Sequence, residues 1–415
     1  MRTTAAFVLA IVFSLPLAAG ADDKAVALAD LEQEALRNNP EILMLEKKAE
    51  SADQRKTLAA ALPDPMVGYM VQNVGAPFVW SVGQQDMSMQ GVVFSQEIPF
   101  PGKLSTKGRA AEKAAEQQHE TLRASRLRVL KDLRSAYYEY YLACKSADIL
   151  DRTKELMKNV ERIAETRYAT GQGMQLDVIR AQLEITMLLD RIAEEDLKKE
   201  KQASLINSLL GRDPLAPLGR PLDLPKEVPA ASVDALAGRA MEHSPMLLSK
   251  KQMVEQSREE LSLSRREYLP DMVLSGGWFK RGERQDVWQA SLMFKIPLYF
   301  WNKASGVDAA KADLNAAQHD YNAERIATLS RVRNLSAEIG TSQHHLHLYE
   351  TGIIPQAKLA LQSATTNYQV GKTEFSSLLE SESTLLKYQL MEQEELVNLN
   401  KTGSMLSEIT GENHE

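Results

Sequence analysis

The side chains of this sequence that could bind a metal are a group of histidines in the C-terminal half and a group of methionines in the N-terminal half. The histidines are His344, His345 and His347. On a helix, positions one and three residues apart do not converge on one point, so only His344 and His347 share a face. Glu350 is the one carboxylate at a neighbouring turn. We interpret these histidines as structural or solvated side chains, with a weak metal contact as the alternative.

The methionines lie close together in the sequence, at Met66, Met70, Met87 and Met89. A thioether is a soft ligand for Cu(I), but methionine also fills gaps in many apolar environments. Packing is the interpretation that we favour, and we expect no metal site and no cofactor in this chain.

Enzyme chemistry has little support in the sequence. An enzyme needs a nucleophile with its base, or converging carboxylates, and no motif of this kind stands out. The pair Gly171-Gln172-Gly173 lacks the third glycine, the preceding strand and the lysine of a nucleotide-binding loop. We therefore expect a protein that is not an enzyme.

Composition and charge narrow the class further. The 415 residues carry a formal net charge of −7 and have only 6 % aromatic side chains. A negative chain without a Lys/Arg run argues against nucleic acid as a partner. Abundant Ala, Leu, Glu, Lys and Gln are typical of long helices. The sequence has no internal apolar stretch long enough for a transmembrane helix.

The N-terminus predicts export. Arg2 is followed by an apolar run at 5–17 and by the small-residue pattern Ala19-Gly20-Ala21, which together are typical of a signal peptide, here 1–21. Cys144 is the one cysteine of the chain, so we expect no disulfide within it. No cysteine directly follows the predicted cleavage site, so we expect no lipid anchor there.

The rest of the chain is a tandem repeat, with copies at 22–213 and 231–411, a Pro-rich linker at 214–230 and a short tail at 412–415. Several motifs return in the same order. They are Leu62-Pro63-Asp64 with Leu269-Pro270-Asp271, Ile98-Pro99 with Ile296-Pro297, and Tyr168-x-x-Gly171 with Tyr368-x-x-Gly371. A repeat of this length predicts that both copies fold into the same set of elements.

Each copy is predicted to contain two short helices, two strands, one very long helix and a final helix. The predicted strand pairs span 66–98 and 272–296, the long helices 103–168 and 303–368, and the final helices 174–210 and 374–410. In the first long helix, Leu130, Leu133, Tyr137, Tyr140 and Cys144 recur in steps of three and four, the seam of a coiled coil. A helix of this length extends about 100 Å and needs lateral neighbours.

The strands favour a membrane barrel over a soluble sheet. The four tryptophans, Trp80, Trp278, Trp288 and Trp301, lie in or beside the predicted strands, as in the aromatic girdles of outer-membrane barrels. Four strands are too few to close a barrel, and a bilayer does not tolerate unpaired strand edges. Several copies must therefore pool their strands.

Prolines mark the points where strand and helix meet. They are Pro63, Pro65, Pro99, Pro101, Pro270 and Pro297. Proline ends a strand because it lacks the N–H donor and has a fixed φ. We expect these residues to form a collar at the membrane surface, where the strands of a barrel give way to helices.

The signal peptide, the two repeats, the LPDP and QEIPFPGK stretches and the Tyr-x-x-Gly turns together resemble the TolC-like outer-membrane efflux proteins. The resemblance implies a mainly α fold with a β-barrel part: a trimeric 12-stranded outer-membrane β-barrel continuous with a 12-helix periplasmic α-barrel. It also implies a periplasmic adaptor protein and an inner-membrane transporter as partners, and outer-membrane lipid around the barrel. LPDP and QEIPFPGK look most like the heavy-metal (CzcC-like) branch, which serves RND-type exporters.

In that family the periplasmic tip carries a gate, with acidic residues six and nine positions after the tip glycine. Here these positions hold Asp177, Arg180, Ser377 and Glu380, so the full acidic set is absent. Our hypothesis is that Asp177 lines the constriction and that Arg180 and Glu380 pair between neighbouring hairpins; ordinary solvated charges are the alternative. The tip turns expected to contact the adaptor are Gly171, Gln172, Gly173, Gly371, Lys372 and Thr373, although helix capping explains the glycines equally well.

The predicted function is a passive outer-membrane duct for heavy-metal cations, driven by an inner-membrane RND pump through the adaptor. A drug-efflux or type I secretion duct of the same fold is one alternative. An exported coiled-coil scaffold without a pore is another, of a different class.

Overall fold

The computed structural model describes residues 25–75, 82–83, 85–227 and 232–411. The predicted signal peptide, the tail and Trp80 lie outside the described residues. The described chain forms two compact units. One unit contains residues 25–33, 136–224 and 357–393, and the other contains 34–135, 225–356 and 394–411.

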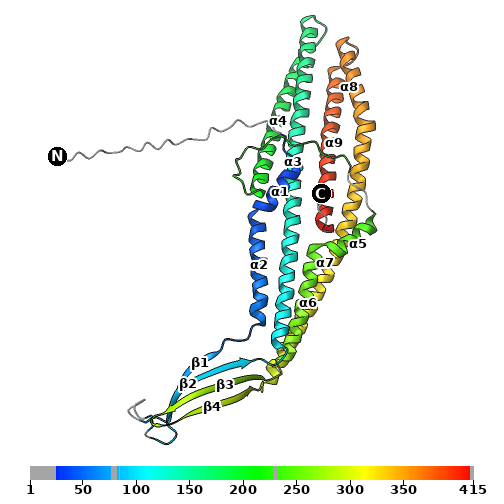
Figure 1. The fold of residues 1–415 in the computed structure, drawn as a ribbon. Helices are drawn as coiled ribbons and strands as arrows, with labels where there is room; N and C mark the ends of the chain where they lie inside the picture. Colours follow the sequence, from blue (N-terminus) through cyan, green and yellow to red (C-terminus); the bar gives the residue numbers. More distant parts are fainter. Residues whose placement is uncertain (1–24, 76–81, 84, 228–231, 412–415) are drawn as a thin grey trace, which may run out of the picture. The chain divides into compact units, whose positions relative to one another are not determined.

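The first half of the chain runs in the predicted order (Figure 1). Its elements are α1 (Leu28–Asn38), α2 (Pro40–Ala60), β1 (Met66–Gln72), β2 (Met89–Ile98), α3 (Lys103–Ala169) and α4 (Gln175–Leu209). The start of α2 shows why the helix begins there. Asn39 caps it with Oδ1, which accepts hydrogen bonds from two backbone N–H groups, and Pro40 occupies its first turn.

The second half repeats this order with one difference. Its elements are α5 (Val233–His243), α6 (Pro245–Arg266), β3 (Asp271–Arg281), β4 (Arg284–Lys295), α7 (Phe300–Leu348), η1 (Tyr349–Ile353), α8 (Ile354–Gln369) and α9 (Phe375–Thr410). The prediction of one unbroken helix at 303–368 is therefore wrong in two respects. The helix begins at Phe300, and a π-helical turn, η1, interrupts it. Such turns occur as single insertions in α-helices.

The four strands form one antiparallel sheet in the order β1-β2-β3-β4. The central pairing joins the two repeats, with Phe94 of β2 opposite Gly276 of β3. In the described part of the chain, the outer edges of β1 and β4 pair with no other strand. Both edges carry backbone donors and acceptors that call for a further partner.

The register sorts the side chains of the sheet into two faces. The apolar face contains Val67, Tyr69, Val71, Val92, Phe94, Leu274, Trp278, Trp288, Leu292 and Phe294. Most of these side chains are exposed, and Trp288 is 80 % exposed. The opposite face, called the polar face below, contains Ser95, Glu97, Ser275, Gln289, Ser291 and Lys295, together with Val93, Val273, Phe279, Val287 and Met293. The sheet therefore has one mainly apolar face and one mixed face.

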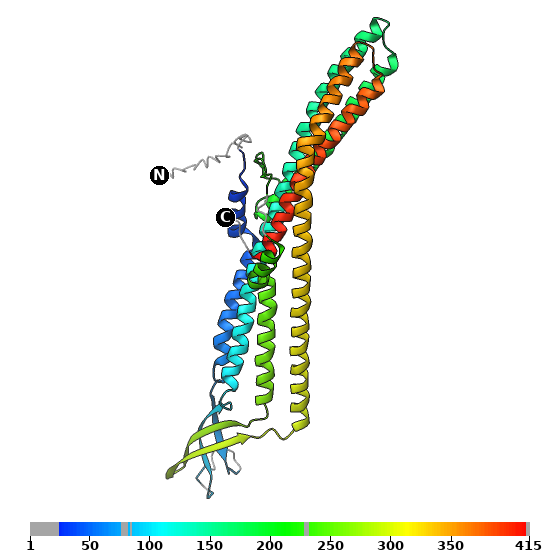
Figure 2. The same cartoon turned by 90° about the vertical axis from the view of Figure 1, so that its right-hand side faces the viewer.

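Helices α2, α6, α7 and the first half of α3 belong to the same unit as the sheet (Figure 2). The first half of α3 packs against α2, where Arg126 binds Glu46 at 2.6 Å. It also packs against α6, where Arg109 binds Glu259 at 2.9 Å. Finally, α6 packs along α7. None of the described helices is long and apolar enough to cross a membrane.

The other unit is built on two helical hairpins, one formed by α3 and α4 and the other by α8 and α9. Its core contains buried apolar side chains from all four helices: Ile149, Leu150, Met157, Val160, Ala164, Ala181, Leu188, Tyr368, Phe375, Leu378 and Leu386. On α3, Leu150, Met157 and Ala164 are seven residues apart, which is a heptad spacing, but they lie one position before the continuation of the predicted seam.

The linker between the repeats is fixed to α3 by tyrosine hydroxyls. Tyr137 donates to the carbonyl of Val26 and accepts from the N–H of Leu222, at 2.9 and 2.8 Å. Tyr140 donates to the carbonyl of Leu218. Two tyrosines of the predicted heptad seam therefore hold the linker as well as packing in the core.

Two adjacent glycines of β3 give a test of the sheet packing. A Cβ at Gly277 would lie 2.6 Å from the ring of the buried Phe279, whereas a Cβ at Gly276 would meet nothing within 4 Å. We expect Gly277→Ala to destabilise the folded chain by about 1–3 kcal/mol through overpacking, and Gly276→Ala, on the opposite face, to have little effect. Thermal unfolding of the two variants in detergent measures the difference. Equal melting temperatures would contradict this packing.

Candidate functional site

A buried ion pair joins the two repeats where the helices meet the sheet. The ammonium of Lys103, the first residue of α3, lies 2.8 Å from Oδ1 of Asp271, the first residue of β3. Their side chains are only 7 % and 19 % exposed. Lys103 also donates to the carbonyl of Leu269, and Asp271 accepts from the N–H of Phe100. Because all these groups are paired, removing one partner would leave a buried charge, at a cost of about 3–5 kcal/mol.

The predicted collar prolines lie at this level of the chain. Pro63 and Pro65 precede β1, Pro270 precedes β3, and Pro297 separates β4 from α7. Pro99 and Pro101 lie between β2 and α3. Sequence reasoning identified these prolines but missed Lys103 and Asp271, whose contact spans 168 residues of sequence.

Gly102 completes the turn from β2 into α3. Its φ is +95°, and a Cβ at this position would lie 2.1 Å from the Arg266 guanidinium. The left-handed backbone favours glycine at this position, whereas the flexible end of the Arg266 side chain could move aside.

The two tip turns share one backbone geometry. Gly171 and Gly371 have φ of +72° and +75°. In each turn the glycine N–H bonds the carbonyl three residues back, and the next N–H, of Gln172 or Lys372, bonds the carbonyl five residues back. This is the Schellman arrangement that ends a helix. The capping interpretation therefore accounts for both glycines, while Gly173 and Thr373 complete the turns.

A polar contact links the two hairpins just behind the tips. The hydroxyl of Tyr368 donates to Oδ2 of Asp177 at 3.0 Å. The Arg167 guanidinium lies over the Tyr368 ring, 4.5 Å from its centroid, and donates to the Tyr368 carbonyl. Burial, and then the hydrogen bond to Asp177, raises the pKa of Tyr368 to about 12, so its hydroxyl remains a donor at any physiological pH. The repeated Tyr-x-x-Gly motif singled out Tyr368, but nothing in the sequence pointed to Arg167.

The other predicted gate residues are exposed. Arg180, Ser377 and Glu380 all lie on the surface of the single chain. Neither Arg180 nor Glu380 forms an ion pair with the described part of the same chain. A pairing of Arg180 with Glu380 is therefore a hypothesis for the contact between two copies.

Glu382 is an acidic residue buried inside the helical core. It is 2 % exposed, and its Oε1 has no hydrogen-bond partner among the described residues. It continues the buried face of α9 that begins with Phe375 and Leu378. Burial, and to a smaller extent the Glu184 carboxylate, raises the pKa of Glu382 to about 7, with Arg191 acting in the opposite direction. Its protonation state therefore changes near neutral pH.

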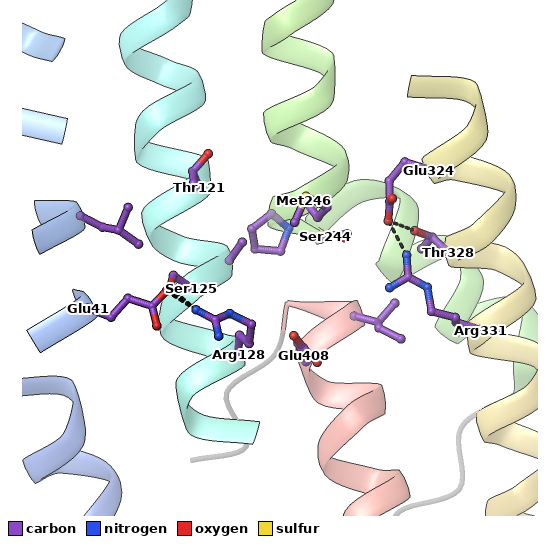
Figure 3. Close-up of a pocket in the computed structure, with 14 residues that line it drawn as sticks. Glu41, Thr121, Ser125, Arg128, Ser244, Met246, Glu324, Thr328, Arg331 and Glu408 are labelled. Carbon is purple, nitrogen blue, oxygen red and sulfur yellow. Dashed lines mark hydrogen bonds and ion pairs between the residues drawn. The ribbon is translucent and has the colours of Figure 1, made fainter. Parts of the chain in front are cut away.

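A cavity of about 290 Å³ lies between α2, α3, α6, α7 and the end of α9 (Figure 3). Its charged side chains are paired, Arg128 of α3 with Glu41 of α2, and Arg331 with Glu324 along α7. Burial raises the pKa of Glu408, a further acidic residue of the lining. Because both guanidinium groups already have carboxylate partners, we interpret the cavity as a region of contact between helices.

Metal-binding geometry is absent from the residues that the structure describes, where no three His, Cys, Asp or Glu side chains gather around one point. Nδ1 of His345 lies 3.6 Å from a carboxylate oxygen of Glu395 of α9. Met66 and Met70 lie on β1, and Met89 begins β2 opposite Gln72. These side chains are parts of the helix and strand surfaces.

A sheet with one apolar and one polar face, joined to long helical hairpins, defines a membrane-channel subunit. The family described as outer membrane efflux protein matches residues 31–211 and 236–411. The chain belongs to the outer membrane efflux protein family. It is therefore a non-enzymatic outer-membrane channel of a Gram-negative tripartite efflux or secretion system, with a periplasmic helical extension. The pore-less scaffold is wrong.

Curated relatives match most of the chain at low identity. The chain is 20 % identical to the cobalt-zinc-cadmium resistance protein CzcC of Cupriavidus metallidurans, over 82 % of this chain and 79 % of that one. It is 24 % identical to the outer membrane protein TolC of Vibrio cholerae, over 85 % and 83 %. The alkaline protease secretion protein AprF of Pseudomonas aeruginosa is 20 % identical, over 88 % and 80 %.

Solved structures agree on the fold. The outer-membrane channel OprN superposes with a TM-score of 0.80 at 18 % identity, over 93 % of this chain and 90 % of that one. The outer membrane protein VceC of Vibrio cholerae superposes with a TM-score of 0.78 at 20 % identity, over 94 % and 97 %. The predicted mainly helical fold with a β-barrel part is confirmed.

The raised pKa of Glu382 predicts a pH-dependent stability. The unfolded carboxyl loses its proton near the ordinary value of 4.5, whereas the folded one holds it to about 7. The stability that this group contributes is thus complete below pH 4.5 and declines as pH rises to about 7, by at most roughly 3 kcal/mol. We expect Glu382→Gln to flatten this part of the stability profile.

Thermal unfolding between pH 4 and pH 8 measures the effect, with Glu380→Gln as the control. Glu380 lies two residues away on the exposed side of α9, so its variant should keep the wild-type profile. Identical profiles for both variants would show that Glu382 titrates normally.

Proposed function

We propose that three copies of this chain form one passive duct, in which a 12-stranded barrel crosses the outer membrane and a 12-helix tunnel continues into the periplasm. The observation that carries this proposal is the two-faced sheet with two open edges. Each copy contributes four strands, and a bilayer tolerates strand edges only when every backbone group is paired. Closure among copies meets this requirement, with the apolar face toward lipid and the polar face toward the lumen.

The tip contact supports a gate at the periplasmic end. Tyr368, Asp177 and Arg167 hold the two hairpins of one copy together. A hydrogen bond to a charged acceptor contributes about 1.5–3 kcal/mol, which the docking of a partner can overcome. Arg180, Ser377 and Glu380 are exposed and complete the proposed gate between copies. The adaptor contacts the turns that contain Gly171, Gln172, Gly173, Gly371, Lys372 and Thr373.

The cargo that we propose is a heavy-metal cation, delivered by an inner-membrane RND transporter through a periplasmic adaptor. The LPDP and QEIPFPGK stretches and the similarity to a cobalt-zinc-cadmium resistance protein support this assignment. No metal site is needed for it, because a passive duct leaves selection and energy to its partners. Export of drugs or of a secreted polypeptide is the second candidate, favoured by the similarity to TolC and to a protease secretion protein.

A deletion strain tests the cargo directly. We expect loss of the chain to increase sensitivity to one group of metals, Cu/Ag, Zn/Co/Cd or Ni, and expression of the wild-type chain to restore resistance. Growth inhibition by metal salts, dyes, detergents and antibiotics measures this. Sensitivity to the organic compounds alone would replace the metal assignment with drug efflux.

The Tyr368 hydroxyl tests the gate. We expect Tyr368→Phe, which keeps the ring over Arg167 but removes the bond to Asp177, to raise the conductance of the purified channel in planar bilayers several-fold. Tyr168→Phe is the matched control, because Tyr168 occupies the same position in the first repeat and is 49 % exposed. Its conductance should equal that of the wild type. If both variants behave alike, the Tyr368–Asp177 bond does not hold the gate.

A further inference from the structure

The ion pair between Lys103 and Asp271 is a contact between two repeats, and the chain contains a second set of the same residues. Gln118-His119-Glu120 returns as Gln318-His319-Asp320, which makes Lys303 the counterpart of Lys103, 200 residues later. Leu62-Pro63-Asp64 returns as Leu269-Pro270-Asp271, which makes Asp64 the counterpart of Asp271. Both counterparts keep the charge.

These two counterparts belong to opposite edges of the sheet. Asp64 immediately precedes β1, and Lys303 lies in the first turn of α7, after β4. Three strand spacings, about 14 Å, separate the two edges, so these residues do not meet within one copy. They lie instead at the two edges that one copy offers to its neighbours.

Both side chains are available for a new partner. Asp64 is exposed and forms no hydrogen bond or ion pair with the described part of its chain. The Lys303 side chain is 34 % exposed, and its ammonium lies 3.1 Å from Glu267, which is itself 43 % exposed. In the first repeat the position of Glu267 is occupied by Ala60, so this local pair is not part of the repeated arrangement.

We infer that Lys303 of one copy forms an ion pair with Asp64 of the next copy, so that the same contact closes every repeat boundary around the assembled collar. The inference rests on the proposed trimer and deepens it by assigning the residues that join the copies.

The register of the strands independently supports the same contact between copies. When the register of β2 with β3 is carried over to β4 and β1, Phe294 lies opposite Val67, and Leu292 lies opposite Tyr69. All four of these side chains belong to the apolar face. A shift of this register by one residue would place apolar-face side chains of one strand opposite polar-face side chains of the other strand. The carried-over register therefore continues both faces across the boundary between copies.

The proposed pair of Lys303 with Asp64 between copies has different surroundings from the pair of Lys103 with Asp271 within a copy. Six positions separate Pro297 from Lys303, whereas four separate Pro99 from Lys103, so the backbone that shields the first pair is not reproduced around the second. Glu267 also competes for Lys303. The pair between copies is therefore the more exposed one, and salt should weaken it more.

Charge reversal tests the pair. We expect Asp64→Lys and Lys303→Asp each to lower the temperature at which the trimer dissociates in detergent, by roughly 5–10 °C, and the double variant to recover most of the loss. Glu267→Gln is the control and should leave the trimer intact. A double variant no better than the single ones, or a Glu267→Gln variant as weak as Lys303→Asp, would overturn the pair.

Cross-linking tests the register without altering the charges. In a Cys144→Ser background, which removes the buried native thiol, we expect Ser291→Cys with Met70→Cys to give covalent dimers and trimers on oxidation. Ser291→Cys with Gly68→Cys is shifted by two residues and should cross-link poorly. Because β1 and β4 are the outer strands of one sheet, these disulfides form only between copies. Preferential cross-linking of the shifted pair would contradict the register.

The proposed pair between copies and the proposed function can each fail without the other. Wild-type trimers whose charge-reversed variants are not rescued overturn the joint and leave the duct standing. Covalent trimers from a chain whose deletion causes no metal sensitivity overturn the cargo and leave the joint standing.

Discussion

The pairing of backbone groups in a bilayer is the constraint on which the rest of this structure depends. In the part of the chain that the structure describes, four strands pair the N–H and C=O groups of three interfaces and leave two edges open. Water can satisfy an open edge, but lipid cannot. A chain that must place this sheet in a membrane is therefore incomplete alone, and the apolar face with its exposed tryptophans has no use in water.

The tandem duplication determines how the open edges of the sheet can be closed. Since each repeat supplies one strand pair and one helical hairpin, a boundary between repeats within one copy resembles a boundary between copies. Lys103 and Asp271 show what such a boundary contains: a charge pair, protected from water, that fixes the start of a helix against the start of a strand. The repeats are not identical, however. The π-helical turn at 349–353 has no counterpart at 149–153, where α3 continues without interruption.

Much of the fold was predictable because it depends on local chemistry. Proline and glycine mark the ends of strands and helices at Pro99, Gly102 and Gly171, and heptad spacing identifies the buried stripe of α3. The missed features are tertiary. Lys103 and Asp271 look like ordinary surface charges until the fold brings them together. Glu382 occupies a buried position at which a heptad pattern predicts an apolar side chain. Because an acidic side chain is ordinarily exposed, sequence reasoning did not place Glu382 in the core. The π-helical turn could not be predicted from the repeat, because the number of residues between Lys103 and the first tip equals the number between Lys303 and the second tip.

The contact at the tip is unequal between the two repeats, and this has a consequence for movement. Arg167 and Asp177 hold Tyr368, whereas the corresponding positions around Tyr168 are Asn367 and Ser377, which carry no charge. In a ring of six hairpins, the three boundaries within copies would be tied by the contact of Arg167, Tyr368 and Asp177, and the three between copies by the proposed pair of Arg180 with Glu380. Because an exposed ion pair contributes only about 0–1 kcal/mol, the boundaries between copies would separate first. The aperture would widen as three double leaves, each keeping its own pair of hairpins together, and its opening would have threefold rather than sixfold symmetry.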